Sequence, residues 1–163
     1  MKILLPVDGS DLSLEAVRFA MRMAGDGLKT SFVLANVQEP SNLYELVVAH
    51  DLQVLAEVSA AAGAHILEAA QNLLSAASLD FESEVASGDP AHTLIDILER
   101  FGCDMVVMGA TGTGRLSSAL LGSVSNDLLR SASVPVLIVK PGQPPDSALD
   151  GLRDEFEGDR QDV

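Results

Sequence analysis

The chain has 163 residues and a formal net charge of −14, with 47% of its residues hydrophobic and 21% charged. This balance is typical of a single globular domain and excludes wholesale disorder. The ten Lys and Arg residues are scattered singly, which argues against nucleic-acid binding because phosphates are neutralised by clustered cations. No apolar run is nearly as long as a membrane span, which needs about 18 residues. The single cysteine, Cys103, suits a reducing compartment, so we expect a cytoplasmic protein.

The first forty residues contain two predicted strands with a helix between them. Lys2–Val7 is a short, nearly continuous apolar run, as expected of a strand that is buried on both faces. Ser10 or Asp11 can cap a helix that continues to about Ala24, because apolar residues recur there at intervals of three and four. Ser31–Val37 is predicted to be the second strand.

The middle of the chain begins with the longest predicted helix, Leu52–Ala77. Its apolar face is predicted to consist of Leu55, Val58, Ala62, Ile66, Ala69 and Leu73. Phe81–Ala86 alternates between apolar and polar residues, which indicates a strand at the edge of a sheet. The turn at Gly88-Asp-Pro then leads into a helix over Ala91–Phe101.

The last elements surround a loop rich in Gly, Ser and Thr. Met105–Met108 is a fully apolar strand, and the loop covers Gly109–Ser118. A helix is predicted over Ser123–Ser131 and a final apolar strand over Val134–Val139. Residues 141–163 carry seven acidic residues against two arginines, and we expect them to form a flexible acidic C-terminal tail.

Strands and helices therefore alternate from the first strand to the fifth. This order predicts an α/β fold, a single open doubly wound parallel five-stranded sheet with helices on both faces, in one domain over residues 1–140. Ligands of such sheets bind beyond the carboxyl ends of the strands, where the strand order reverses. The loops after the first and fourth strands are thus the candidate binding loops.

Both candidate loops have features suited to an anionic ligand. The first loop contains Asp8-Gly9-Ser10, and the second contains Gly109, Gly112 and Gly122, the last directly before a helix. Glycines allow the backbone to approach a ligand, and N–H groups at a helix start favour anions. Neither a Walker loop nor a Rossmann fingerprint fits these residues. Taken alone, the glycines are equally consistent with a simple turn.

The spacing of the glycines resembles a known signature. Gly109, Gly112, Gly122 and Ser123 match the Gly-x2-Gly-x9-Gly-Ser/Thr pattern of ATP-binding universal stress proteins. The segments PVDGS, NV, GDP and VPVLIVKP resemble the same family and occur in the right order. The resemblance covers the chain from Met1 to about Pro141 and implies the fold predicted above.

The resemblance also implies a nucleotide-binding site. Its residues would be Pro6, Val7, Asp8, Val37, Met108, Gly109, Thr111, Gly112, Arg115, Gly122, Ser123, Val124 and Ser125. Asp8 and the backbone of Val37 match the family's contacts to adenine, and a carboxylate suits the exocyclic amine of adenine. The alternative for Asp8 is a helix cap, and the alternative for Val37 is a core position at a strand end.

The remaining matches concern the ribose and the phosphates. Gly109 and Gly112 match backbone that approaches them, and residues 122–125 match the cradle for the β- and γ-phosphates. Ser123 has a compatible alternative as a helix N-cap. Arg115 is either a γ-phosphate contact or a solvated loop residue. Any Mg²⁺ would be held mainly by the phosphates, because the three histidines are scattered and no protein metal site is expected.

The family resemblance implies an ATP-binding, nucleotide-dependent regulatory protein of the stress response. Because no nucleophile or acidic metal-ligand set accompanies the predicted phosphate loop, no catalytic residue is assigned. The alternatives are a slow ATP hydrolase and a cyclic-AMP-binding member of the same family. The resemblance further implies a homodimer that pairs through Val134–Val139, with an unknown regulatory protein as its partner.

Overall fold

The computed structural model describes residues 1–39, 52–112 and 121–141, with only the backbone described for residues 52–56. The elements are β1 (Lys2–Pro6), α1 (Asp11–Gly25), β2 (Ser31–Gln38), α3 (Leu52–Ala76), β3 (Phe81–Ser87), α4 (Pro90–Phe101), β4 (Met105–Gly109), α5 (Ser123–Ser131) and β5 (Val136–Val139). The predicted order of elements is confirmed, and their ends differ from the predictions by at most two residues.

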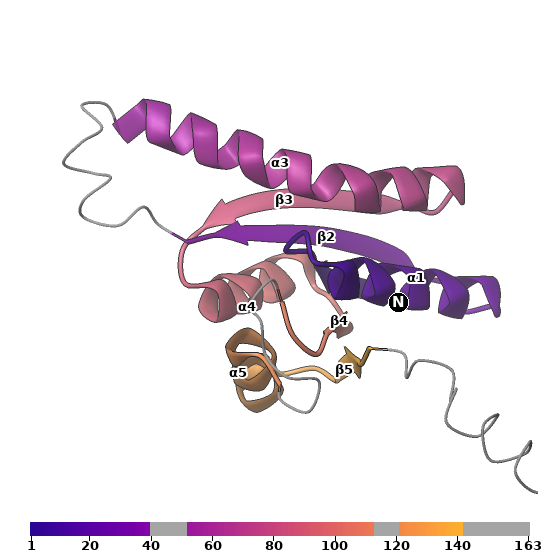
Figure 1. Ribbon diagram of the computed structural model, residues 1–163. Coiled ribbons are helices and arrows are strands. Elements are labelled where there is room, and N and C mark those ends of the chain that lie inside the picture. The colour runs from indigo at the N-terminus through magenta and orange to yellow at the C-terminus, as the bar shows by residue number, and fades with distance from the viewer. Residues whose placement is uncertain (40–51, 113–120, 142–163) are drawn as a thin grey trace, which may run out of the picture.

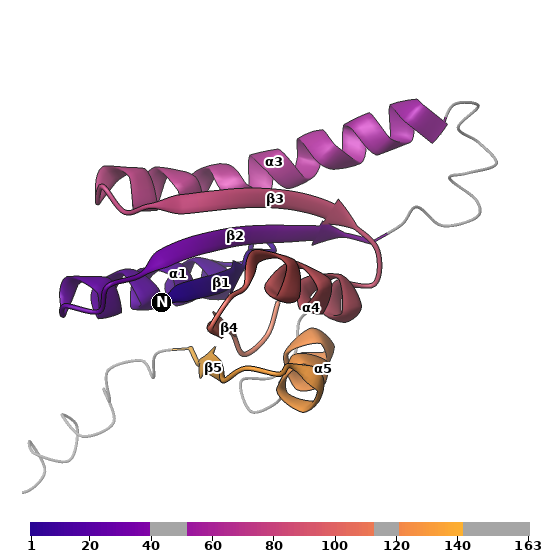
Figure 2. The same ribbon diagram turned by 180° about the vertical axis from the view of Figure 1, so that it is seen from behind.

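The five strands form one parallel sheet in the order β3-β2-β1-β4-β5. Helices α1 and α3 cover one face of this sheet, while α4 and α5 cover the other (Figures 1 and 2). The chain changes direction across the sheet at β1, which lies between β2 and β4. The loops after β1 and β4 therefore meet at the carboxyl end of the sheet. Among the described residues, no helix is long and apolar enough to cross a lipid bilayer.

The hydrophobic core lies on both faces of the sheet. In β1, the side chains of Ile3 and Leu5 belong to the cluster under α1 and α3, and Leu4 belongs to the cluster under α4 and α5. All three are at most 1% exposed. The continuous apolar run thus has the physical cause that the sequence suggested: both faces of this strand are covered.

The buried face of α3 differs from the prediction. Leu67, Ala70 and Leu74 are buried, whereas the predicted core positions Val58, Ala62 and Ala69 are exposed. Leu55 lies among the residues whose side chains are not described, and Ile66 and Leu73 pack only partly against the core. The helix is so rich in Ala that two neighbouring stripes are apolar, and periodicity could not choose between them.

A glycine in the middle of α3 lets that helix lie close to the sheet. A Cβ atom added at Gly63 would be 2.4 Å from Cγ1 of Val85 and 2.8 Å from Oδ1 of Asn36. Val85 is β-branched and has little rotamer freedom, so it cannot easily move aside. The position of Gly63 therefore selects the stripe of α3 that faces the core.

We expect Gly63→Ala to destabilise the protein although alanine is the better helix former. Overpacking against Val85 and Asn36 should lower the free energy of unfolding by about 1–2 kcal/mol. The matched control is Gly25→Ala, because a Cβ at that helical residue would meet nothing within 4 Å. This control should be more stable than the wild type by about 0.5 kcal/mol. Urea unfolding measures both values, and a stabilised Gly63→Ala protein would contradict the packing argument.

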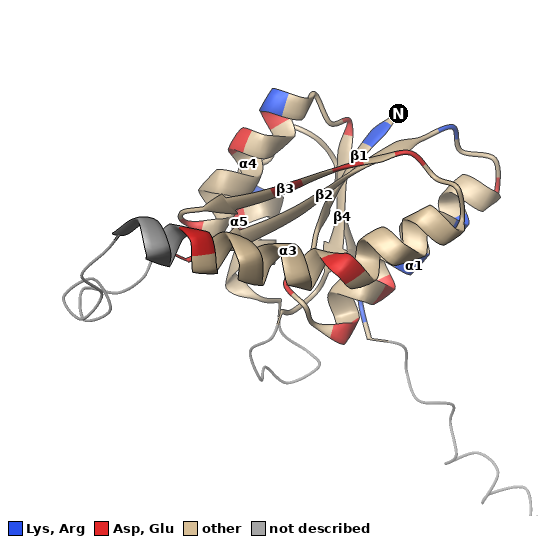
Figure 3. Cartoon of the chain, turned by 90° about the horizontal axis from the view of Figure 1, so that it is seen from above, with Lys and Arg blue, Asp and Glu red and all other residues tan. Residues whose placement is uncertain are grey.

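The two edges of the sheet differ in charge. β3, correctly predicted as an edge strand, carries acidic residues (red in Figure 3). Its Glu82 and Glu84 pair with Lys2 (2.9 Å) and Arg100. Charged side chains of this kind discourage pairing with another chain. β5 forms the opposite edge and carries only apolar residues. The β5 edge is therefore the one that is open to further strand pairing.

Candidate functional site

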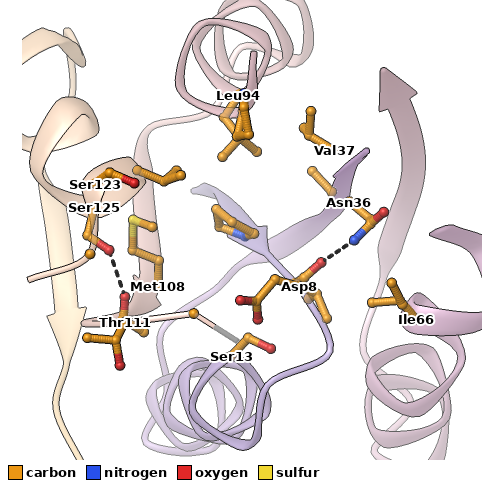
Figure 4. Close-up of a pocket in the computed structure, with 18 of the residues that line it drawn as sticks. Asp8, Ser13, Asn36, Val37, Ile66, Leu94, Met108, Thr111, Ser123 and Ser125 are labelled. Carbon is orange, nitrogen blue, oxygen red and sulfur yellow. Dashed lines mark hydrogen bonds between the residues drawn. The ribbon is translucent and has the colours of Figure 1, made fainter. Parts of the chain in front are cut away.

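A cavity of about 530 Å³ opens at the carboxyl ends of β1, β2 and β4. Its walls also include residues from α3, α4 and α5 (Figure 4). All the predicted site residues that the structure describes line it: Pro6, Val7, Asp8, Val37, Met108, Gly109, Thr111, Gly112, Gly122, Ser123, Val124 and Ser125. Arg115 lies outside the described residues. The structure thus brings the two predicted loops together around one space, while their contacts to a ligand remain predictions.

The loop after β1 is held by its own side chains. Asp8 Oδ1 accepts hydrogen bonds from the N–H of Ser10 (3.0 Å) and from its hydroxyl (2.6 Å). The side-chain Oγ of Ser10 in turn accepts a hydrogen bond from the Ser13 N–H at 3.1 Å, so Ser10 is the N-cap of α1. The capping alternative considered for Asp8 is therefore wrong, and its carboxylate lines the cavity in a fixed orientation.

Two glycines, one at the end of β4 and one in the loop that follows, lie where a side chain would crowd other parts of the protein. A Cβ at Gly109 would lie 3.0 Å from Cγ of Leu12 and 3.2 Å from the backbone of the same residue, so this glycine allows α1 to pack on β4. A Cβ at Gly112 would lie 2.3 Å from Oδ2 of Asp8. The loop after β4 therefore comes so close to the loop after β1 that a side chain would collide with the Asp8 carboxylate.

Gly122 is different, because no contact with the described residues requires it to be glycine. Its φ of −65° and ψ of 160° are open to any residue. Against the described residues, a Cβ there would make ordinary contacts, at 3.5 Å with the Ala110 carbonyl oxygen and with Cα of Thr111 and at 3.8 Å with Oγ of Ser125. A residue at this position that bears no side chain leaves space in the cavity wall.

The first turn of α5 directs N–H groups at the cavity. Gly122 is the N-cap and provides no side-chain cap, so the N-cap alternative for Ser123 is wrong. The Gly122 N–H itself donates to the Ala110 carbonyl at 2.8 Å. The N–H groups of Ser123, Val124 and Ser125 have no acceptor within their helix, as in every first helical turn. They form the electropositive end of the helix dipole.

Ser125 ties this helix to the sheet. Its side chain is buried, and its hydroxyl donates to the Gly109 carbonyl at 3.1 Å (Figure 4). The Ser123 side chain, by contrast, is exposed. Of the two predicted serines, Ser125 thus positions the turn, and Ser123 has the hydroxyl that is free to face a ligand.

The charged side chains that line the cavity among the described residues are the acidic Asp8 and Glu39. Positive potential in this described part comes from backbone N–H groups and the α5 dipole. No group of three or more His, Cys, Asp or Glu residues that could hold a metal ion occurs in the described ranges. His65 and His92 are exposed; His65 pairs with Glu68 of the same helix, and His92 pairs with Asp89, the N-cap of α4. His50 is outside those ranges.

Eight further described residues that line the cavity were not predicted from the sequence as part of the site. They are Ser13, Ala35, Asn36, Gln38, Glu39, Ile66, Pro90 and Leu94. Val37, Ile66 and Leu94 make the part of the cavity away from α5 apolar, whereas Met108 lies on the side of Ser125 and Thr111 (Figure 4). Asn36 could have been noticed in the sequence, because it is the one polar residue inside the apolar run of β2. It is only 3% exposed, so its side chain has a structural role.

Comparison with known proteins agrees with this architecture. The model of the universal stress protein family matches residues 1–140. Universal stress protein MJ0531 of Methanocaldococcus jannaschii is 30% identical over 139 residues, which cover 85% of this chain and 81% of the relative. A protein solved as hypothetical protein MJ0577 has a TM-score of 0.73 and 25% identity, covering 88% of this chain and 97% of that one. A universal stress protein solved in complex with cAMP has a TM-score of 0.61 and 26% identity, covering 86% and 96%. The chain belongs to the universal stress protein family.

Proposed function

We propose that the cavity binds an adenine nucleotide and that this chain is an ATP-binding, nucleotide-dependent regulator in the stress response. One observation carries the proposal: the first turn of α5, which has no side-chain cap, faces the cavity beside Gly122, a glycine that neither its backbone conformation nor packing against the described residues requires. Such a turn is an anion site, and the missing side chain leaves room for phosphate. The glycine spacing and the cAMP complex of a relative support the same ligand class.

The two ends of the cavity suit the two ends of a nucleotide. In the proposed arrangement, the base lies at the apolar end near Val37, Ile66 and Leu94, and the phosphates lie at the first turn of α5. Mg²⁺ would be coordinated mainly by the phosphates and would reduce their charge near Asp8. Apolar walls and a few directed polar groups are what small-ligand sites generally use.

One observation favours a less charged ligand as the second candidate. Among the described lining residues the side-chain charges are acidic, which disfavours the polyphosphate of free ATP more than the single charge of cAMP. The test is mass spectrometry of the nucleotide that the purified chain retains, followed by calorimetric titration with MgATP and cAMP. Tighter binding of MgATP supports the regulator as proposed, tighter binding of cAMP supports the alternative, and binding of neither contradicts both.

We expect ATP turnover to be far slower than about 1 per second, the low end of common enzymes. Phosphoryl transfer needs positioned metal ligands and a residue that orients the nucleophile, and the described lining offers only Asp8 and Glu39 as acids. Asp8 is already engaged with Ser10. Release of phosphate from MgATP by the purified chain measures the rate. Fast turnover that disappears in a Gly122 variant would make the protein an ATPase instead.

The proposal includes a homodimer that forms through β5. The strand is apolar, lies at the sheet edge and carries no charge to discourage pairing. A two-fold pair would satisfy both edges with one self-complementary interface. The proposed dimer acts in the cytoplasm, which agrees with the single, buried cysteine, and it would present its nucleotide state to a regulatory protein.

A further inference from the structure

The backbone of β2 bonds alternately to its two neighbours. The Ser31 N–H donates to the Met1 carbonyl at 3.0 Å, and the Ala35 carbonyl accepts from Val7 at 2.8 Å, so odd-numbered residues face β1. The Phe32 N–H donates to the Asp80 carbonyl, and the Gln38 carbonyl accepts from Gly88, both at 3.0 Å. Even-numbered residues therefore face β3.

This alternation directs the N–H and C=O of Val37 toward β1, just where β1 ends. The next rung of the ladder would join the Val37 N–H to the carbonyl of Val7. Among the described residues, no backbone hydrogen bond joins these two. Instead, the Val7 carbonyl accepts from Nδ2 of Asn36 at 2.7 Å (Figure 4).

The amide of Asn36 is buried and makes a hydrogen bond at each of its ends. Its side chain is 3% exposed, and its Oδ1 accepts from Nε2 of Gln38 at 2.5 Å. Gly63 of α3 closes over the same oxygen, since a Cβ there would lie 2.8 Å from it. Both ends of the amide are engaged, and the bond to Val7 is enclosed within the protein.

We propose that Asn36 is a positioning residue: its amide replaces the last rung between β1 and β2, and this leaves the N–H and C=O of Val37 open toward the cavity for reading the base. The inference rests on the proposed nucleotide function, in which the Val37 backbone contacts the base, and adds the residue that keeps this backbone available. An N–H beside a C=O matches the N1 acceptor and the N6 amine of adenine. Hypoxanthine presents N1–H and O6 instead, so donor would face donor and acceptor would face acceptor.

The test compares ATP with ITP, which differ only in these groups of the base. For the wild type we expect MgATP to bind at least about tenfold more tightly than MgITP, because a polar site rejects a mismatched partner. In Asn36→Val the Val7 carbonyl loses its side-chain donor, and the Val37 N–H is free to close the ladder. The ratio of the two affinities should then fall below about threefold.

The matched control is Gly122→Asn, a change at the phosphate end. This variant should weaken the binding of both nucleotides equally and keep the ratio of their affinities. If the role of Asn36 were merely structural, the ratio would also stay unchanged in Asn36→Val. A folded Asn36→Val protein that retains the wild-type ratio overturns the inference. A wild type that binds neither nucleotide overturns the proposed function itself, and that result is distinct from the first.

Hydrogen exchange gives a second readout that needs no ligand. In the ligand-free wild type, the Val37 amide should exchange much faster than the neighbouring amide of Ala35, which belongs to the β2 strand beside β1. In Asn36→Val, protection of Val37 should rise. Equal protection of both amides in the wild type would show that Val37 already has a partner, and the positioning role would be wrong.

Discussion

Gly122→Asp is expected to lower the affinity for MgATP by at least about 100-fold, equivalent to about 2.7 kcal/mol, while leaving the fold at least as stable. The helix gains a side-chain cap, because an aspartate at the N-cap accepts from first-turn N–H groups and its charge suits the helix dipole. The same carboxylate occupies those N–H groups and repels the phosphates. Stability and binding should therefore change in opposite directions, as calorimetry and thermal unfolding can measure.

Gly122→Asn is the matched control for this experiment. Asparagine caps a helix about as well as aspartate and has nearly the same shape, but it carries no charge. We expect this variant to lower the affinity for MgATP by no more than about tenfold, because its side chain competes for the N–H groups without repelling the phosphates. Either residue can adopt the backbone conformation of Gly122, whose φ is −65°. Wild-type affinity in a folded Gly122→Asp protein would contradict the phosphate site at α5.

Ile138→Pro is expected to convert the proposed dimer into a monomer at micromolar concentration. The carbonyls of Pro135 and Val139 accept hydrogen bonds from the N–H groups of Val106, in β4, and of Ala110, directly after β4, at 2.9 and 2.8 Å. By the alternation of a strand, the N–H of Ile138 then points away from β4 and out of the edge. Proline removes this donor without breaking a bond to β4, and it blocks the approach of a second strand.

The control for the dimer experiment is Leu137→Pro, which removes a backbone N–H on the side of β5 that faces β4. Leu137 packs into the core cluster under α1, and the alternation turns its N–H toward β4, so this variant should unfold rather than dissociate. Light scattering measures the mass, and circular dichroism checks the fold. A wild type that is already monomeric at micromolar concentration, with or without ATP, would contradict pairing through β5.

The order of the elements could be predicted because each strand depends on short-range patterns. The run in β1 is apolar since it is covered on both faces, and the alternation in β3 reflects its place at an edge. The face of α3 could not be predicted in the same way. Its orientation depends on a long-range contact, the fit of Gly63 against Val85, which leaves no trace in the helical periodicity.

The candidate site shows the same division between local and long-range causes. Its glycines are visible in the sequence, but their separate roles depend on which atoms come close in space. Gly112 makes room for Asp8 and Gly109 for Leu12, whereas at Gly122 no atom of the described residues excludes a side chain. Asn36 was not predicted to be a site residue, because the sequence does not show which group a polar residue within a strand will contact. Here that group is the carbonyl of Val7.

The most direct test of nucleotide binding in this cavity is a map of backbone amide shifts during titration of the isotope-labelled full chain with MgATP. We predict saturable shifts, with one site per chain, at the amides of Gly112, Ser123, Val124 and Ser125 for the phosphates and at Val37 for the base. Shifts that cluster on another face of the sheet, or no shifts at millimolar MgATP, would contradict the account.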